Sequence, residues 1–96
     1  MEIRNIRHKG LRAFAETNNA KGLHKNAQSK IADILAYLIE IESIDEVFDL
    51  HKFKPHQLSG RRKGTYSLHV TANWWITFKY DAAGNELYDL DYEDYH

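Results

Sequence analysis

The hydrophobic repeat of this chain changes once along its length, from a helical period to a strand period, and this change most constrains the fold. Over residues 26–41 the apolar side chains share one stripe of a helix: Ile31, Ile34, Leu35, Leu38 and Ile41. Over residues 73–80 apolar and polar residues alternate instead, which predicts a strand with one buried face. Helices followed by strands are typical of an α+β fold.

The other segments agree with this fold class. Leu11 and Phe14 have helical spacing and predict a first helix over residues 8–17. Alternation predicts further strands at residues 1–6, 66–70 and 86–92. Residues 81–85 are rich in turn formers and would close the last hairpin. We therefore predict an α+β fold with two N-terminal helices packed on a small, mainly antiparallel β-sheet.

Two local predictions concern the segment between the second helix and the hairpins. Lys52-Phe53-Lys54 alternates, and it predicts a short strand that ends at Pro55, the only proline of the chain. His56 would then stand on a loop directly after this strand. Gly60 and Gly64 bracket a basic loop formed by Arg61, Arg62 and Lys63.

Length and composition limit the class of protein. With 96 residues the chain has room for one core, and we expect a single domain over residues 1–96. It contains no cysteine, which suits a reducing cytoplasm. The longest apolar stretch, Ile34 to Ile39, is much too short to cross a bilayer. We expect a cytoplasmic protein with no membrane contact.

Charge is segregated along the chain although the net charge is only −1. Residues 50–80 contain no acidic residue, whereas residues 81–96 contain no lysine or arginine. The basic residues of the middle segment are Lys52, Lys54, Arg61, Arg62, Lys63 and Lys79. Opposite charges would pair across neighbouring strands, or they would form a phosphate-binding surface beside catalytic carboxylates. The sequence leaves both interpretations open.

Trp75 is out of place in its predicted strand. Alternation puts Trp74 on the buried face and Trp75 on the polar face with Thr77 and Lys79. An indole on such a face stacks on a nucleobase, anchors a protein partner, or packs under a neighbouring loop without further function.

Side chains that can exchange protons are concentrated at the end of the chain. Asp94, Tyr95 and His96 offer a carboxylate, a phenol and an imidazole, and His56 with the basic loop would complete an acid–base site. Such groups suit metal-free RNA cleavage, in which a base activates the 2′-hydroxyl and an acid protonates the leaving oxygen. The alternative is a polar terminus without a catalytic role.

The other histidines do not suggest a metal site. His51, His56 and His69 lack the spacing of known ligand motifs, and no cysteine accompanies them. We expect neither a metal nor a cofactor. His8 and His24 belong to no constellation and are expected at the surface.

Several blocks of the sequence resemble the HigB toxins, which belong to the wider RelE-like superfamily. The blocks are residues 6–11, 56–60, 66–70, 73–78 and 91–96. The resemblance runs from the first strand to the last residue, and the ending Asp94-Tyr95-His96 is its most specific part.

The resemblance implies a toxin that enters the ribosomal A site and cuts mRNA there without metal. A HigA-type antitoxin with a helix-turn-helix would silence it, and the complex would bind operator DNA and repress its own operon. The resemblance assigns acid–base and orienting roles to His56, Asp94, Tyr95 and His96. It also implies RNA binding by the cations Lys54, Arg61, Arg62, Lys63 and Lys79.

Two residues depart from the family pattern. These toxins usually read Asn-Trp-Arg where this chain has Asn73-Trp74-Trp75, so a cation expected to stabilise the cleaved phosphate is missing. Losing such a contact typically costs about 10²–10³ in rate, and we expect a weakened or inactive toxin. Ser59 stands where many relatives have lysine. The alternative function is a catalytically silent module that captures the antitoxin and takes part in operon repression.

Overall fold

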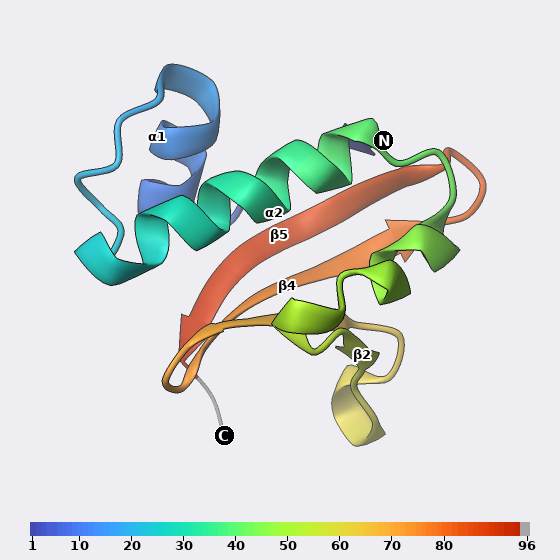
Figure 1. Cartoon of the computed structure of the whole chain (residues 1–96). Helices are drawn as coiled ribbons and strands as arrows, with labels where there is room; N and C mark the ends of the chain where they lie inside the picture. Colours follow the sequence, from blue (N-terminus) through green and yellow to red (C-terminus); the bar gives the residue numbers. More distant parts are fainter. Residues whose placement is uncertain (95–96) are drawn as a thin grey trace.

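The computed structural model describes residues 1–94 as a five-stranded sheet with both α-helices on one side of it (Figure 1). The strands are β1 (Glu2–Ile3), β2 (His56–Gln57), β3 (Tyr66–Thr71), β4 (Trp74–Asp81) and β5 (Glu86–Asp94). The α-helices are α1 (Lys9–Thr17) and α2 (Gln28–Glu40). Short 3-10 helices lie at η1 (Lys25–Ala27), η2 (Ile44–Asp49), η3 (His51–Phe53) and η4 (Gly60–Arg62).

The strand order is β1-β5-β4-β3-β2, and only the β1–β5 pair is parallel among the strands of residues 1–94. This confirms the mixed α+β class. The description of the two helices as N-terminal needs correction, because the strand predicted at residues 1–6 is present as β1 and precedes both of them. The reason lies in packing: Ile3 pairs in register with Leu87 of β5 and packs against the core, so the first residues belong to the sheet.

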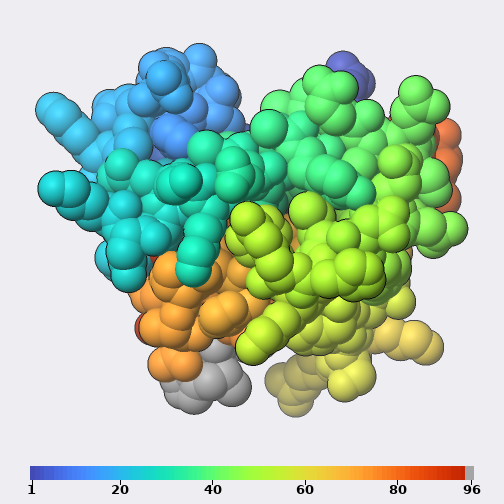
Figure 2. Space-filling view, viewed as in Figure 1, coloured from blue at the N-terminus to red at the C-terminus, as the bar shows by residue number. Residues whose placement is uncertain are grey.

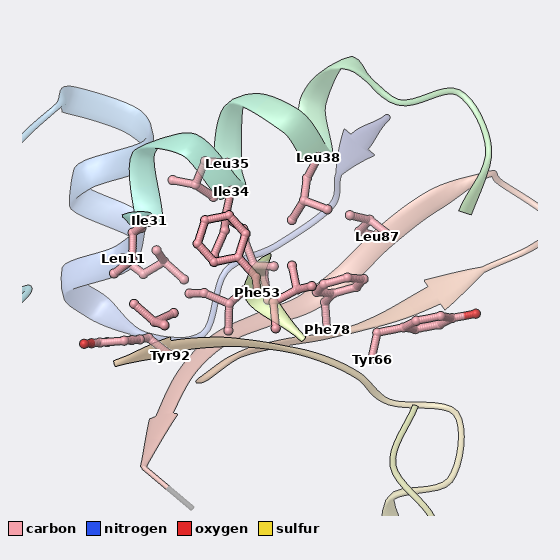
Figure 3. Packing of buried hydrophobic residues seen from close by; sticks show 14 of the residues in the cluster. Leu11, Ile31, Ile34, Leu35, Leu38, Phe53, Tyr66, Phe78, Leu87 and Tyr92 are labelled. Atoms are coloured by element: carbon pink, nitrogen blue, oxygen red, sulfur yellow. The ribbon is translucent and has the colours of Figure 1, made fainter. Parts of the chain in front are cut away.

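The apolar stripe of α2 forms the centre of the core, as its spacing predicts (Figure 3). Ile31, Ile34 and Leu38 are fully buried against the sheet. Phe78 of β4 and Leu87 of β5 are fully buried in the same cluster. In the space-filling view α2 and residues 44–53 cover much of this side of the sheet (Figure 2).

Helix α1 begins and ends as its sequence suggests. The Nδ1 atom of His8 accepts a hydrogen bond from the Leu11 backbone N–H at 3.0 Å, so the imidazole acts as the N-cap. Asn18 ends the helix in the left-handed conformation, which asparagine tolerates well. Gly10 lies directly against Gly22: a Cβ added to Gly10 would stand 2.6 Å from the Gly22 carbonyl oxygen. No residue with a side chain fits at this contact.

The predicted strand at residues 52–54 is wrong. His51–Phe53 form the 3-10 helix η3, and Lys54 follows in the left-handed conformation with φ 48°. A single buried residue, Phe53 at 2% exposure, anchors the segment, and one apolar residue between two lysines fits a helical turn as well as a strand. The predicted loop at His56 is wrong too, because His56 pairs with Ser67 as part of β2.

A β-bulge in β5 sets which of its side chains face the core. Leu87 and Leu90 are both fully buried although they stand three residues apart, which simple alternation forbids. Asp89, with φ 51°, is the extra residue between them, and the β4–β5 register shifts at this level. The bulge therefore resets the alternation so that Asp91 and Glu93 face away from the helices.

No helix within residues 1–94 combines the length and the apolar character that crossing a bilayer requires.

Candidate active site

The polar residues of the sheet gather on the face opposite the helices, which we call the polar face. Ile76 and Phe78 point into the core, so the alternating Trp75 and Thr77 point to the polar face. Strand register places two rows there, the first of His56, Ser67, Thr77 and Asp91 and the second of His69, Trp75 and Glu93. The two rows bring together residues from four strands.

His56 is held on this face by two polar partners. Its Nδ1 lies 3.2 Å from the Lys54 carbonyl oxygen, which only accepts, so Nδ1–H is the donor in this bond. Ser67 Oγ lies 3.2 Å from Nε2 and 3.5 Å from Nδ1, and with Nδ1–H directed at the Lys54 carbonyl the hydroxyl would be the donor to Nε2. Ser67 is fully buried, so its hydroxyl is fixed in place, while the imidazole itself is exposed.

Trp75 packs between two imidazoles on the polar face. Its ring centroid lies 5.5 Å from that of His56 at an interplanar angle of 89°, and 4.9 Å from that of His69 at 68°. Both are edge-to-face contacts of the kind that aromatic pairs prefer. The half-buried indole therefore restricts where the His56 ring can move.

Beside this cluster lies a cavity of about 350 Å³, which we call the basic hollow. The side chains that line it come from the segment between β1 and α1, from η4 and the residues that follow it, and from strands β4 and β5. They are the cations Arg7, Arg61, Arg62, Lys63 and Lys79, the carboxylates Asp89, Asp91 and Glu93, and Thr65, Thr77 and Phe78. The hollow therefore combines opposite charges in one space.

Glu93 connects the two parts of this region. Arg62 donates to its two carboxylate oxygens from Nη1 at 3.0 Å and from Nη2 at 2.7 Å, and the Thr77 hydroxyl also donates to it. Burial would raise the pKa of Glu93, but the hydrogen bonds from Arg62 and Thr77 and the charge of Arg7 outweigh burial and lower it. Glu93 is thus a carboxylate that orients Arg62.

The other predicted RNA-binding cations are distributed around the polar face. Lys79 Nζ lies 3.9 Å from Asp89 Oδ2 across the bulge. Arg61 and Lys63 are exposed on the η4 turn, and Lys54 is exposed next to His56. Cross-strand charge pairing therefore exists alongside an exposed group of cations.

The C-terminal residues are only partly described. Asp94 is the last residue of β5 and pairs in register with Trp74. Alternation along β5 therefore puts Asp94 on the same face as Tyr92, and not on the polar face with Glu93. It is exposed at the strand end. The predicted roles of Tyr95 and His96 lie outside the described residues.

His8 and His24 have structural contacts that the sequence does not reveal. His24 Nδ1 lies 2.8 Å from the Tyr92 hydroxyl, and the His24 ring packs edge-on against Trp74 at 4.7 Å. His8 caps α1 and also packs against Tyr92 at 5.4 Å. Within residues 1–94 no group of three or more histidine, aspartate or glutamate side chains is arranged to hold a metal ion.

A small α+β domain with a histidine, carboxylates and cations on one face of its sheet carries the groups that acid–base chemistry on a phosphodiester requires. In agreement with this chemistry, the profile of the RelE-like toxin of type II toxin–antitoxin system HigB matches residues 4–96. The chain belongs to this HigB-like toxin family. It is also 35% identical over 96 residues to a Proteus vulgaris protein named Endoribonuclease HigB, covering 98% of this chain and 99% of the relative.

The sequence alone did not single out Ser67, Glu93 or Thr65. Alternation places Ser67 on the polar side of β3, but its pairing with His56 depends on a two-residue strand that has no sequence pattern of its own. The Arg62–Glu93 pair was visible only as two segments of opposite charge. Nothing in the sequence distinguishes Thr65 from other threonines.

Proposed function

We propose that this chain is a toxin that acts as an mRNA endonuclease on the ribosome and needs no metal ion. Family membership and the name of the Proteus vulgaris relative support nuclease activity. The observation that carries the proposal is the position of His56, exposed on the polar face, oriented by Ser67 and next to the basic hollow. The proposed place of action is the cytoplasm, where translating ribosomes are found.

The proposed reaction uses the 2′-hydroxyl of the message as the nucleophile. A base removes its proton, the oxygen attacks the adjacent phosphorus, and an acid protonates the departing 5′-oxygen. In this proposal His56, Asp94, Tyr95 and His96 share the acid–base and orienting roles. Asp94 acts from the exposed end of β5, since alternation does not put it in the row of His56. The Nδ1–H of His56 donates to the Lys54 carbonyl, which leaves Nε2 as the atom that accepts a proton. Ser67 releases Nε2 when the substrate hydroxyl takes its place.

The cations of the polar face supply RNA binding in this proposal. Lys54 is exposed beside His56, while Arg61, Lys63 and Lys79 line the hollow. Arg62 joins them with its guanidinium oriented by Glu93. These few cations hold the message only weakly in water, and we propose that the ribosomal A site aligns it for attack.

Trp75 weakens this chemistry. It occupies the position next to His56 where the family resemblance places an arginine, and an indole cannot stabilise charge developing on the phosphate. Trp75→Arg should raise the rate of mRNA cleavage on translating ribosomes by about 10²–10³. An unchanged rate would show that Trp75 is not the defect.

The site assignment is tested in the same ribosome assay. His56→Ala in the Trp75→Arg background should abolish the gained cleavage, whereas His51→Ala, which removes an exposed histidine on η3, should keep it. His96→Ala and Asp94→Asn should each reduce cleavage as well. Cleavage of free mRNA at the ribosome-dependent rate would contradict the proposed need for the ribosome.

The second candidate function is a catalytically silent binding module. It would capture a HigA-type helix-turn-helix antitoxin and bind operator DNA as part of that complex. Packing of Trp75 against both His56 and His69 favours this candidate, since the indole restricts the imidazole. Co-expression with the antitoxin, followed by purification and an operator-binding assay, tests for the complex. A chain that forms the complex but cuts no message at any concentration supports the silent module.

A further inference from the structure

The basic hollow is too mixed in charge to be explained as a binding site for RNA backbone alone. A backbone site needs cations that neutralise phosphates. Here the carboxylates Asp89, Asp91 and Glu93 line the same space as the cations. Carboxylates repel phosphate, but they accept hydrogen bonds from N–H groups such as those on the edges of nucleobases.

A second, independent observation points to a ligand in this hollow. Thr65 is 2% exposed and lines the hollow, yet its buried Oγ1 has no hydrogen-bond partner among residues 1–94. The backbone of Thr65 is satisfied, because its N–H donates to the Arg62 carbonyl and its carbonyl accepts from Leu58 N–H. Buried hydroxyls are normally paired, so an unpaired one calls for an explanation. A bound polar group would satisfy it.

Access to this hydroxyl depends on the η4 turn. Gly60 and Gly64 bracket the turn at φ 67° and 91°, and space is open around both glycines. Such positions give the backbone freedom to shift as a ligand enters. Arg61 and Lys63, which the turn carries, would then stand at the mouth of the hollow.

Asp91 is the carboxylate best suited to bind a base. Glu93 is occupied by Arg62 and Thr77, and Asp89 accepts from Asn5 Nδ2 at 3.0 Å. Asp91 accepts the backbone N–H of Tyr92 at Oδ1, and its side chain lines the hollow. A carboxylate has a second oxygen that can accept a hydrogen bond from a base.

We propose that the basic hollow binds a nucleobase that carries an exocyclic amino group, with its edge on Asp91 and Thr65 and its phosphate on Arg61 and Lys63. This inference rests on the proposed function and names the part of the RNA that the hollow selects. A cavity of about 350 Å³ is within the range of small-ligand sites. Adenine, guanine and cytosine each offer the amino group, whereas uracil does not.

The position of the hollow fits a nucleotide close to the one that is cut. Thr77 of β4 lines the hollow and belongs to the same row as His56 of β2. Ser67 of β3 lies between them in this row. Neighbouring strands are about 4.8 Å apart, so the two places are roughly 10 Å from each other. One short RNA segment spans that distance, and the base in the hollow would bias which codon is cleaved.

Direct binding of mononucleotides to the free protein tests the inference without any cleavage. In NMR titrations, 5′-AMP, 5′-GMP and 5′-CMP should shift the backbone amides of Thr65, Thr77 and Asp91, and 5′-UMP should bind about tenfold more weakly. Inorganic phosphate is the probe for a plain anion site. Equal binding of all four nucleotides and of phosphate, or no shift at these amides, would overturn the proposal.

Substitutions locate the selectivity. Asp91→Asn and Thr65→Val should each reduce the preference for amino-bearing nucleotides over 5′-UMP to about twofold or less. Asp33→Asn is the matched control, because Asp33 is exposed on α2, away from the polar face. Preference that persists in both hollow variants would refute the assignment of Asp91 and Thr65.

The proposed function and this inference fail in different ways. A protein that selects nucleotides but never cuts mRNA, even as Trp75→Arg, refutes the nuclease and supports the hollow. A protein that cuts mRNA without any nucleotide preference refutes the hollow and supports the nuclease.

Discussion

Replacing the unpaired hydroxyl of Thr65 should stabilise the protein. Thr65→Val keeps the branched shape of the side chain and removes a buried Oγ1 that has no hydrogen-bond partner in the described part of the chain. Leaving a buried hydroxyl unpaired costs about 1–3 kcal/mol, and replacement by an apolar group of the same shape recovers part of that cost. We expect the free energy of unfolding to rise by about 1–2 kcal/mol. For a domain of this size each kcal/mol raises Tm by about 4–8 °C.

Thr77→Val is the matched control for this experiment. Thr77 is equally buried at 1% exposure, but its hydroxyl donates to the Glu93 carboxylate. Hydrogen bonds to charged groups contribute about 1.5–3 kcal/mol, so the same chemical change should destabilise the protein there. Urea unfolding followed by circular dichroism measures both variants, and their effects should have opposite sign.

The result that refutes the reasoning is a loss of stability in Thr65→Val. Such a loss would mean that the hydroxyl has a partner in solution, for example an ordered water in the hollow. A gain in stability together with weaker nucleotide binding would instead show that the unpaired hydroxyl is kept for function, as strained or unsatisfied groups at binding sites often are.

Three further predictions concern other parts of the fold. The lowered pKa of Glu93 contributes stability that is fully present above the ordinary value of about 4.5 and is lost as pH falls through the lowered pKa. In urea unfolding, the stability deficit of Glu93→Gln should therefore shrink between pH 7 and pH 3. A deficit that stays constant over this range would contradict the argument. Gly10→Ala should cost about 1–3 kcal/mol because its Cβ would collide with the Gly22 backbone, and a wild-type Tm would show that the two segments separate easily. In the Trp75→Arg background, Ser67→Ala should lower mRNA cleavage by about 2–10-fold and change its pH profile, because the hydroxyl that contacts His56 is lost. Ser67→Thr should retain the pH profile of the Trp75→Arg protein. Identical profiles for these three proteins would exclude a role for Ser67 in orienting His56.

The sequence predicts the elements that have a strong local period. Helix α2 and strands β3 and β4 follow from apolar spacing, because the apolar side chains of each lie on the one face that packs against the core. Strand β2 could not be predicted, since its two exposed residues carry no periodic signal and are held only by pairing with β3. The β5 bulge leaves a trace in the sequence: Leu87 and Leu90 are out of phase with simple alternation.

The candidate site is less predictable than the fold, because its contacts join residues that are distant in the chain. Histidine, carboxylates and cations are visible in the sequence as chemical types. Which carboxylate meets which cation is decided by the three-dimensional fold, which brings Arg62 of η4 onto Glu93 of β5. The unpaired oxygen of Thr65 arises from three-dimensional packing and has no sequence signal.

The parallel pairing of β1 with β5 has a consequence for the order in which the chain folds during its synthesis. Asn5, just after β1, donates to Asp89, 84 residues later, and β5 lies between β1 and β4. At a synthesis rate of about 5–20 residues per second, the first strand waits roughly 4–17 s for its partner. Until then neither the core nor the polar face can close. The sheet, and with it the candidate site, therefore forms only after β5 has been synthesised.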